Sequence, residues 1–157
     1  DDIYLTSASS LIGQTEGTMF VEVDWQKTTG LFQALLNVDD NSANNRVGLF
    51  RYNSTNQLSM VIKSNNVTQT EQGISDASIT GIQKIALAYK QNDAELYVNG
   101  SSVSTDTSVD LTALATLTDV NFGQYFDSSI QANMWIRAVA LFTTRLSDAE
   151  CEALTTI

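Results

Sequence analysis

Histidine and proline are absent from this chain of 157 residues, and cysteine occurs once. The absence of histidine excludes Ser-His-Asp and Cys-His nucleophile systems, histidine-based metal sites and the commonest general base at neutral pH. A single cysteine, Cys151, excludes an intramolecular disulfide, so the fold must depend on packing. These absences argue against most familiar classes of catalyst.

Basic residues are also scarce. Lys and Arg number 8 against 18 for Asp and Glu, which gives a formal net charge of −10. Because every contact to a phosphate needs a cation, this balance argues against nucleic acid or an anionic membrane as partners. No apolar run approaches the length of a membrane span. A length of 157 residues suits one domain. Because the chain starts at Asp1, we expect this domain, residues 1–157, to be cut from a longer polypeptide.

Uncharged polar residues are abundant: Ser, Thr and Asn together make 46 of the 157 residues. Thr favours strands and Asn favours tight turns, so this composition is typical of a β protein. Apolar and polar residues alternate in short runs separated by turn residues, which predicts an antiparallel sandwich or barrel. The predicted strands cover residues 18–25, 33–37, 46–52, 57–63, 83–90, 95–99, 101–105, 120–124 and 134–143.

Three short segments predict specific turns and a helix start. Residues 91–93 and the pair Asn99-Gly100 predict two hairpins, because Asn and Gly tolerate the positive φ angles of a type I′ turn. Residues 147–150 read Ser-Asp-Ala-Glu, a capping box that predicts a short helix over 148–154. With no base beside it, Cys151 is expected to be a buried packing residue on that helix. Trp25 alternates with Val23, which predicts a core position; Trp135 is left open between the core and a subunit contact.

The order of these features resembles a known superfamily. Residues 84–90 followed by 95–100 resemble the central hairpin of laminin-G-like, concanavalin A-type jelly rolls. Residues 136–150 resemble their last strand and small helix, and residues 17–24 resemble their first long strand. The compact, disulfide-free form is most similar to the versions found in phage tail fibres, tailspikes and other virion proteins.

This resemblance implies an all-β fold, a two-sheet antiparallel jelly-roll sandwich with a short C-terminal helix. It also implies a non-catalytic carbohydrate-binding module, a lectin at the virion surface that recognises a host glycan or lipopolysaccharide during adsorption. By analogy with fibres, other virion chains, including a homotrimer of this chain, are expected partners. The alternative is a structural decoration or fibre-assembly domain that binds no sugar.

Sugar binding calls for aromatic platforms flanked by polar groups, because sugar rings present C–H faces and hydroxyl edges. Tyr125 and Asp127 lie in a predicted loop, and Tyr52 ends a predicted strand flanked by Arg46 and Arg51. These five residues are the predicted ligand contacts, and Tyr125 is the foremost because loops on a rigid sandwich carry function.

Calcium is the predicted cofactor, since many laminin-G-like domains hold this ion at one edge. Asp39, Asp40, Asn41 and Asn44 place hard oxygen ligands in one loop, although an ordinary acidic turn has the same composition.

A third hypothesis is that the chain is a glycosidase. Glu22-Val23-Asp24 matches the start of the Glu-x-Asp-x-x-Glu strand of laminarinase-like enzymes, but Lys27 replaces the second Glu. Since a retaining mechanism needs two carboxyl groups, this substitution disfavours catalysis.

Overall fold

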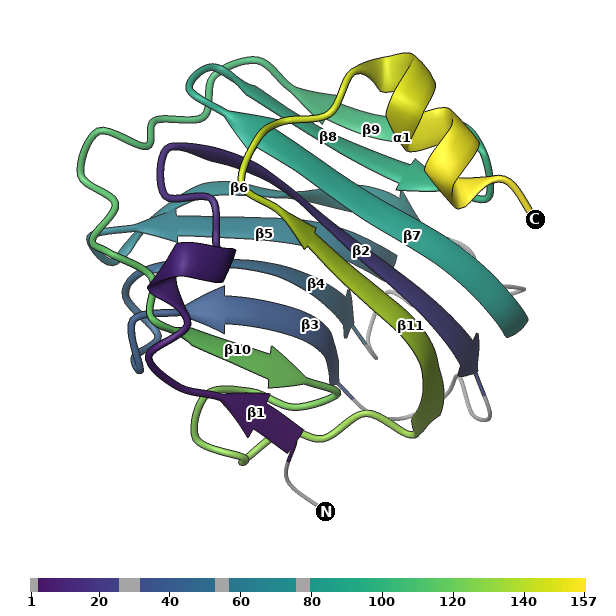
Figure 1. Cartoon of the computed structure of the whole chain (residues 1–157), viewed down its shortest axis with the longest axis horizontal. Coiled ribbons are helices and arrows are strands. Elements are labelled where there is room, and N and C mark those ends of the chain that lie inside the picture. The colour runs from purple at the N-terminus through teal and green to yellow at the C-terminus, as the bar shows by residue number, and fades with distance from the viewer. Residues whose placement is uncertain (1–2, 26–31, 53–56, 76–79) are drawn as a thin grey trace.

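The computed structural model describes residues 3–25, 32–52, 57–75 and 80–157 (Figure 1). Within these ranges the chain forms strands, one short 3-10 helix at Ser9–Leu11 and one α-helix, α1, at Asp148–Thr155. The strands are β1 (Ile3–Leu5), β2 (Glu16–Trp25), β3 (Gln33–Asp39), β4 (Arg46–Tyr52), β5 (Gln57–Ser64), β6 (Val67–Ser75), β7 (Gly81–Lys90), β8 (Asp93–Val98), β9 (Ser101–Asp106), β10 (Asp119–Phe122) and β11 (Met134–Phe142).

The strands form two antiparallel sheets. Sheet A has the order β1-β10-β3-β4-β5-β6, and sheet B has the order β11-β2-β7-β8-β9. The sheets pack face to face, and α1 lies over β7, β8 and β9 on the far side of sheet B (Figure 1). The predicted fold class, an all-β sandwich with a short C-terminal helix, is confirmed.

The core lies between the sheets and follows the alternation of the strands. Met19, Val21 and Val23 of β2 point inward and belong to one buried cluster with the inward residues of β3, β4 and β5. Trp25 ends this row with 3% of its surface exposed, so its predicted core position is confirmed. Because successive side chains on a strand point to opposite faces, each sheet also presents an outer face.

The hairpin turns agree closely with the sequence. Asn99 and Gly100 both have positive φ, 51° and 83°, and join Val98 to its partner Ser101. The turn before β8 is one residue shorter than predicted, because Asp93 already pairs with Lys90. A third two-residue turn, Asn65-Asn66, has φ angles of 48° and 63° and was not predicted.

Two strands were missed. Among the described strands, β6 is an edge strand paired with β5 alone, and polar residues occupy most of its length. Its inward residue Gln72 donates a hydrogen bond to Asp106 of β9 at 3.1 Å instead of joining an apolar row. Strand β1 has three residues, and its one partner in the described part of the chain is β10. Neither strand carries an apolar alternation that a sequence pattern can reveal.

The helix begins as predicted. The Ser147 hydroxyl accepts from the Glu150 amide at 3.4 Å, and the Glu150 carboxylate accepts from the Ser147 amide at 2.8 Å. Cys151 of α1 is fully buried, as expected, and packs against sheet B, where it contacts a cluster made by Phe20, Ala86, Ala88 and Tyr97. The small residues Ala86 and Ala88 leave room for the helix to approach the sheet.

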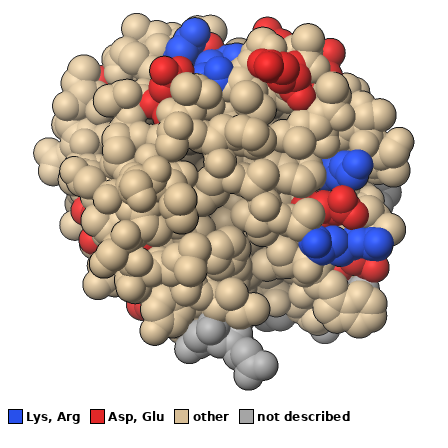
Figure 2. Space-filling view, in the orientation of Figure 1, with Lys and Arg blue, Asp and Glu red and all other residues tan. Residues whose placement is uncertain are grey.

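Charged side chains gather near the top and right of Figure 2, and the remaining surface in that view is largely uncharged. Arg145 joins α1 to sheet B by pairing with Asp93 at 2.8 Å, Glu95 at 3.1 Å and Asp148 at 3.0 Å. Within the described ranges, no helix has the length and apolarity needed to cross a membrane.

Candidate glycan-binding face

The outer face of sheet A carries an apolar patch that is separate from the core between the two sheets. Ala34, Phe50 and Val61, one from each of β3, β4 and β5, are fully buried there. Within the described ranges, no helix covers them. Instead, four partly buried side chains lie over the patch: Phe32, Tyr52, Tyr125 and Ile130. Tyr125 and Ile130 come from the segment 123–133 between β10 and β11, which therefore folds back over the face of sheet A.

Aromatic rings dominate this cover. Phe32 lies 5.6 Å from Phe50 and 4.8 Å from Tyr52, measured between ring centroids. Tyr125 lies 6.0 Å from Phe50 and 4.7 Å from Phe126, both in edge-on arrangements. Ring pairs at these separations attract one another beyond their simple burial. We call these five residues the aromatic cluster.

Arg46 is built into this cluster. Its guanidinium lies 5.2 Å from the ring centroid of Tyr125 and 5.6 Å from that of Phe50. Its Nη1 donates to the Tyr125 hydroxyl and to the Ala43 carbonyl, the latter at 3.1 Å. Cation–π contacts and hydrogen bonds together fix the side chain in place. Arg46 thereby holds Tyr125 against the sheet.

The segment 123–133 is held by its own backbone. Gly123 has a φ of 67°, which favours glycine, and its amide donates to Leu35 of β3 at 2.8 Å. The Tyr125 amide donates to Ile130 at 2.9 Å, and the Ser128 amide donates to Tyr125 at 3.0 Å. Further along, Asp127 Oδ1 accepts from the Ser129 amide at 3.0 Å. These bonds give the segment a defined shape.

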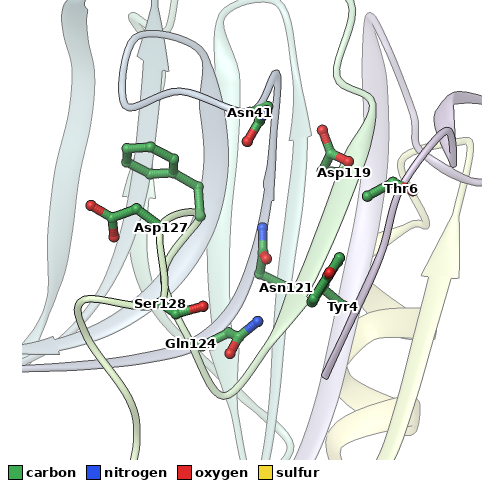
Figure 3. Close-up of a pocket in the computed structure, with 9 residues that line it drawn as sticks. Tyr4, Thr6, Asn41, Asp119, Asn121, Gln124, Asp127 and Ser128 are labelled. Atoms are coloured by element: carbon green, nitrogen blue, oxygen red, sulfur yellow. The ribbon is translucent and has the colours of Figure 1, made fainter. Parts of the chain in front are cut away.

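A hollow of about 420 Å³ opens between this segment and β1 (Figure 3). Its volume lies in the range of small-molecule sites. Figure 3 shows Asn121 at its centre, Tyr4 and Thr6 on one side and Ser128 and Asp127 on the other. The hollow is lined by Tyr4, Thr6, Asn41, Asp119, Asn121, Gln124, Phe126, Asp127 and Ser128.

The strand register explains the polar floor of this hollow. Asn121 of β10 lies opposite Asn37 of β3, and Asp119 lies opposite Asp39, all on the outer face of sheet A. Asp39 is fully buried and accepts from Asn121 Nδ2 at 2.8 Å and from the Asn41 amide at 2.9 Å. Burial raises the pKa of Asp39 to about 7, and the Asn41 and Asn121 hydrogen bonds oppose this rise. The hydrogen bond to the buried Asp39 carboxyl group therefore fixes the orientation of the Asn121 side chain at the floor of the hollow.

Three of the predicted ligand residues are brought together. Tyr52, Tyr125 and Arg46 all belong to, or contact, the aromatic cluster, although none of the three lines the hollow. Burial raises the pKa of the Tyr52 hydroxyl, which is also hydrogen-bonded to Glu71. Asp127 lines the hollow at its rim, and hydrogen bonds from Ser129 lower the pKa of its carboxyl group. Asn53, beside Tyr52, lies outside the described residues.

Arg51 lies elsewhere. It is 1% exposed and stacks over the Trp25 ring at 4.7 Å, inside the sandwich. Arg46 and Arg51 are five positions apart on one strand, so their side chains must point to opposite faces. The structure corrects the expectation that both contact a ligand: Arg51 is a packing residue.

The predicted calcium loop is occupied by internal hydrogen bonds. The Asp39 carboxylate turns onto Asn121 and the Asn41 amide, while Asp40 Oδ2 accepts from Asn45 Nδ2 at 2.8 Å. Asn44 is exposed, and its amide donates to Ser42 Oγ at 3.0 Å. Among the described residues, no three acidic, His or Cys side chains converge. As arranged, this loop does not fit a calcium ion, and calcium binding stays a prediction.

The residues of the glycosidase motif lie on the opposite sheet. Glu22 belongs to the outer face of sheet B and pairs with Arg137 Nε of β11 at 3.2 Å. Lys27 lies outside the described residues. Glu22 is therefore engaged in a cross-strand ion pair and is remote from the hollow on sheet A.

Sequence reasoning missed most of the hollow. Asn121 could have been found, because it alternates with the buried Val120 and the partly buried Phe122 on a predicted strand. Gln124, Phe126 and Ser128 were reachable only as neighbours of Tyr125. Tyr4 and Thr6 gave no signal, because β1 itself was not predicted.

Comparisons with known proteins bear on the fold. No protein-family model and no curated protein matches the chain. Among solved structures, the chain is similar over its full length to a leech intramolecular trans-sialidase, with 16% identity and a TM-score of 0.75, and spans only 27% of that chain.

Two further structures are similar. The Ruminococcus gnavus IT-sialidase CBM40 has 14% identity and a TM-score of 0.73, with 100% of this chain matched to 97% of that one. The binding domain of botulinum neurotoxin DC has 14% identity and a TM-score of 0.76, with 98% of this chain matched to 39% of that one. At these identities the likeness establishes a shared two-sheet β-sandwich fold.

Proposed function

We propose that this chain is a non-catalytic carbohydrate-binding module that acts in host adsorption at the surface of a phage virion, within a tail fibre or tailspike. Its ligand is a host cell-surface glycan or lipopolysaccharide, and its site is the hollow on the outer face of sheet A. The phage context rests on the resemblance of the sequence to virion jelly rolls.

One observation carries the proposal: the hollow combines ring faces with hydrogen-bonding groups on a rigid support. Phe126 and Tyr4 offer aromatic surfaces, and Asn41, Asn121 and Gln124 offer amides that can pair with sugar hydroxyls. The comparisons lend support, since a Ruminococcus gnavus CBM40 of the same fold was solved bound to α2,3-sialyllactose.

The test is a multivalent display of the protein on an array of bacterial glycans and lipopolysaccharides. We expect binding to a defined sugar, and we expect Phe126→Ala to weaken it by about tenfold or more, the loss of one stacking contact. Trp135→Ala is the matched control, because Trp135 is an aromatic residue 65% exposed and outside the hollow. Repeating the array with calcium and with chelator tests the predicted cofactor.

A second function is favoured by a separate observation. At the open edge of the sandwich, between β1 and β11, large apolar side chains reach the surface: Ile3, Leu5, Leu11 and Trp135 are 45–65% exposed. Exposed apolar patches mark interaction surfaces. A structural role in fibre assembly, including a homotrimer, would use this edge. Silence of the folded, multivalent protein on every glycan, together with self-association that Trp135→Ala abolishes, would favour this function over glycan binding.

A further inference from the structure

The hollow on sheet A has an unusual charge balance. Two carboxylates, those of Asp119 and Asp127, line it, and no Lys or Arg is among the residues that do so. Asp119 Oδ2 accepts from Thr118 Oγ1 at 2.7 Å, and Asp127 Oδ1 accepts from Ser129. Within the described part of the chain, neighbouring residues donate to one oxygen of each carboxylate, which leaves the other oxygen for a ligand.

The cations of the chain are placed away from the hollow. Arg46, on the same face, is committed to the Ala43 carbonyl and the aromatic rings. Lys63 extends to Asn66 at 3.3 Å, and Arg51 is buried in the core. The other four described cations belong to β7, β11 and the segment before α1: Lys84, Lys90, Arg137 and Arg145. Lys27 is outside the described residues.

The floor of the hollow adds a further acceptor. Asn121 donates its Nδ2 to the buried Asp39, which turns the amide nitrogen away and leaves the Asn121 carbonyl oxygen for the hollow. Together with the two carboxylates, this oxygen makes the hollow rich in acceptors. Sugar hydroxyls can donate to such groups, whereas a sugar carboxylate would meet like charge without a compensating cation.

We propose that the hollow selects uncharged, hydroxyl-rich glycans and rejects glycans that carry a carboxylate. This inference rests on the proposed function and adds the chemical class of the ligand. It separates the chain from the similarly folded Ruminococcus gnavus CBM40, which was solved with sialyllactose. Specificity here comes from repulsion of the wrong ligand as much as from attraction of the right one.

The test uses paired glycans that differ only by one carboxylated sugar, such as lactose and sialyllactose. We expect the neutral member of a bound pair to bind about tenfold or more tightly than the acidic member. Equal binding, or preference for the acidic member, would overturn the inference and leave the proposed function standing. Binding to no glycan of either kind would instead refute the proposed function and the inference with it.

Two variants locate the source of the discrimination. Asp127→Asn removes one charge from the rim, and we expect it to reduce the preference for the neutral glycan. Asp110→Asn is the matched control, because Asp110 Oδ1 accepts from the Thr112 amide and hydroxyl as Asp127 Oδ1 accepts from those of Ser129. An unchanged preference in Asp127→Asn, or an equal reduction in both variants, would contradict a role for the carboxylates of the hollow.

Discussion

The outer faces of the two sheets meet the same physical problem in different ways. Each carries a buried apolar patch that the sandwich core does not cover. On sheet B, α1 closes the patch with Cys151 and Leu154. On sheet A, side chains of a folded-back segment cover the patch together with Phe32 and Tyr52, and a polar hollow lies beside it. A regular helix seals a face, whereas an irregular segment can cover apolar surface and still present functional groups.

The largest expected effect on stability comes from removing one buried aromatic ring on the outer face of each sheet. Phe20 is 6% exposed beneath α1, and Phe50 is fully buried beneath Tyr125. Phe20→Ala and Phe50→Ala should each lower the free energy of unfolding by about 3–5 kcal/mol, measured by urea denaturation. Only Phe50→Ala should also weaken glycan binding, because Phe50 supports Tyr125 and Arg46. Equal loss of binding in the two variants would mean that the two faces do not differ in function.

The next effect concerns pH. The pKa of Asp39 is raised from 3.8 to about 7, so between these values the folded protein holds a proton that the unfolded chain has released. The contribution of this group to stability is therefore fully present below about pH 4. It falls by about 1.4 kcal/mol per pH unit as pH rises toward 7.

Asp39→Asn should remove this slope, which urea denaturation at several pH values would show. At low pH the free energy of unfolding of the variant should be lower than that of wild type, because the amide replaces one hydrogen-bond acceptor. This difference in stability should shrink as pH rises. Parallel pH profiles for wild type and variant would show that Asp39 does not titrate in this range.

The smallest effect is at the helix cap. Ser147→Ala removes the hydroxyl that accepts from Glu150, and we expect a loss of about 1 kcal/mol in the free energy of unfolding. Ser147→Asn should restore most of that loss, since Asn caps helices as well as Ser does. Glycan binding should be the same in both variants. A loss of binding in Ser147→Ala would show that the helix on sheet B is coupled to the hollow on sheet A.

The sequence allowed most of the fold to be predicted, because its cues are local. Alternation on β2 and β7, the Asn99-Gly100 turn and the Ser147 capping box each depend on residues close together in the chain. Strand β6 escaped because its inward positions include the polar residues Thr70 and Gln72, and Gln72 hydrogen-bonds to Asp106 in place of an apolar contact.

The site was less predictable because its cues are not local. Tyr125, Tyr52 and Arg46 were each named as candidate ligand contacts, and the structure places them in or against one aromatic cluster, but their partner Phe50 was not named. The hollow depends on the pairing of β10 with both β1 and β3, which brings Tyr4, Asn121 and Asn37 side by side from distant parts of the chain. The different positions of Arg46 and Arg51 could have been predicted, because residues an odd number of positions apart on one strand point to opposite faces of the sheet.

The most direct test of the central claim is to map the contact surface of a bound glycan by NMR, using isotope-labelled protein and the tightest-binding sugar from the array. We predict that the backbone amides that shift lie around the hollow, in residues 4–6, 119–121 and 124–128. Shifts confined to the outer face of sheet B, or to the exposed edge around Trp135, would contradict the assignment of the hollow as the glycan site.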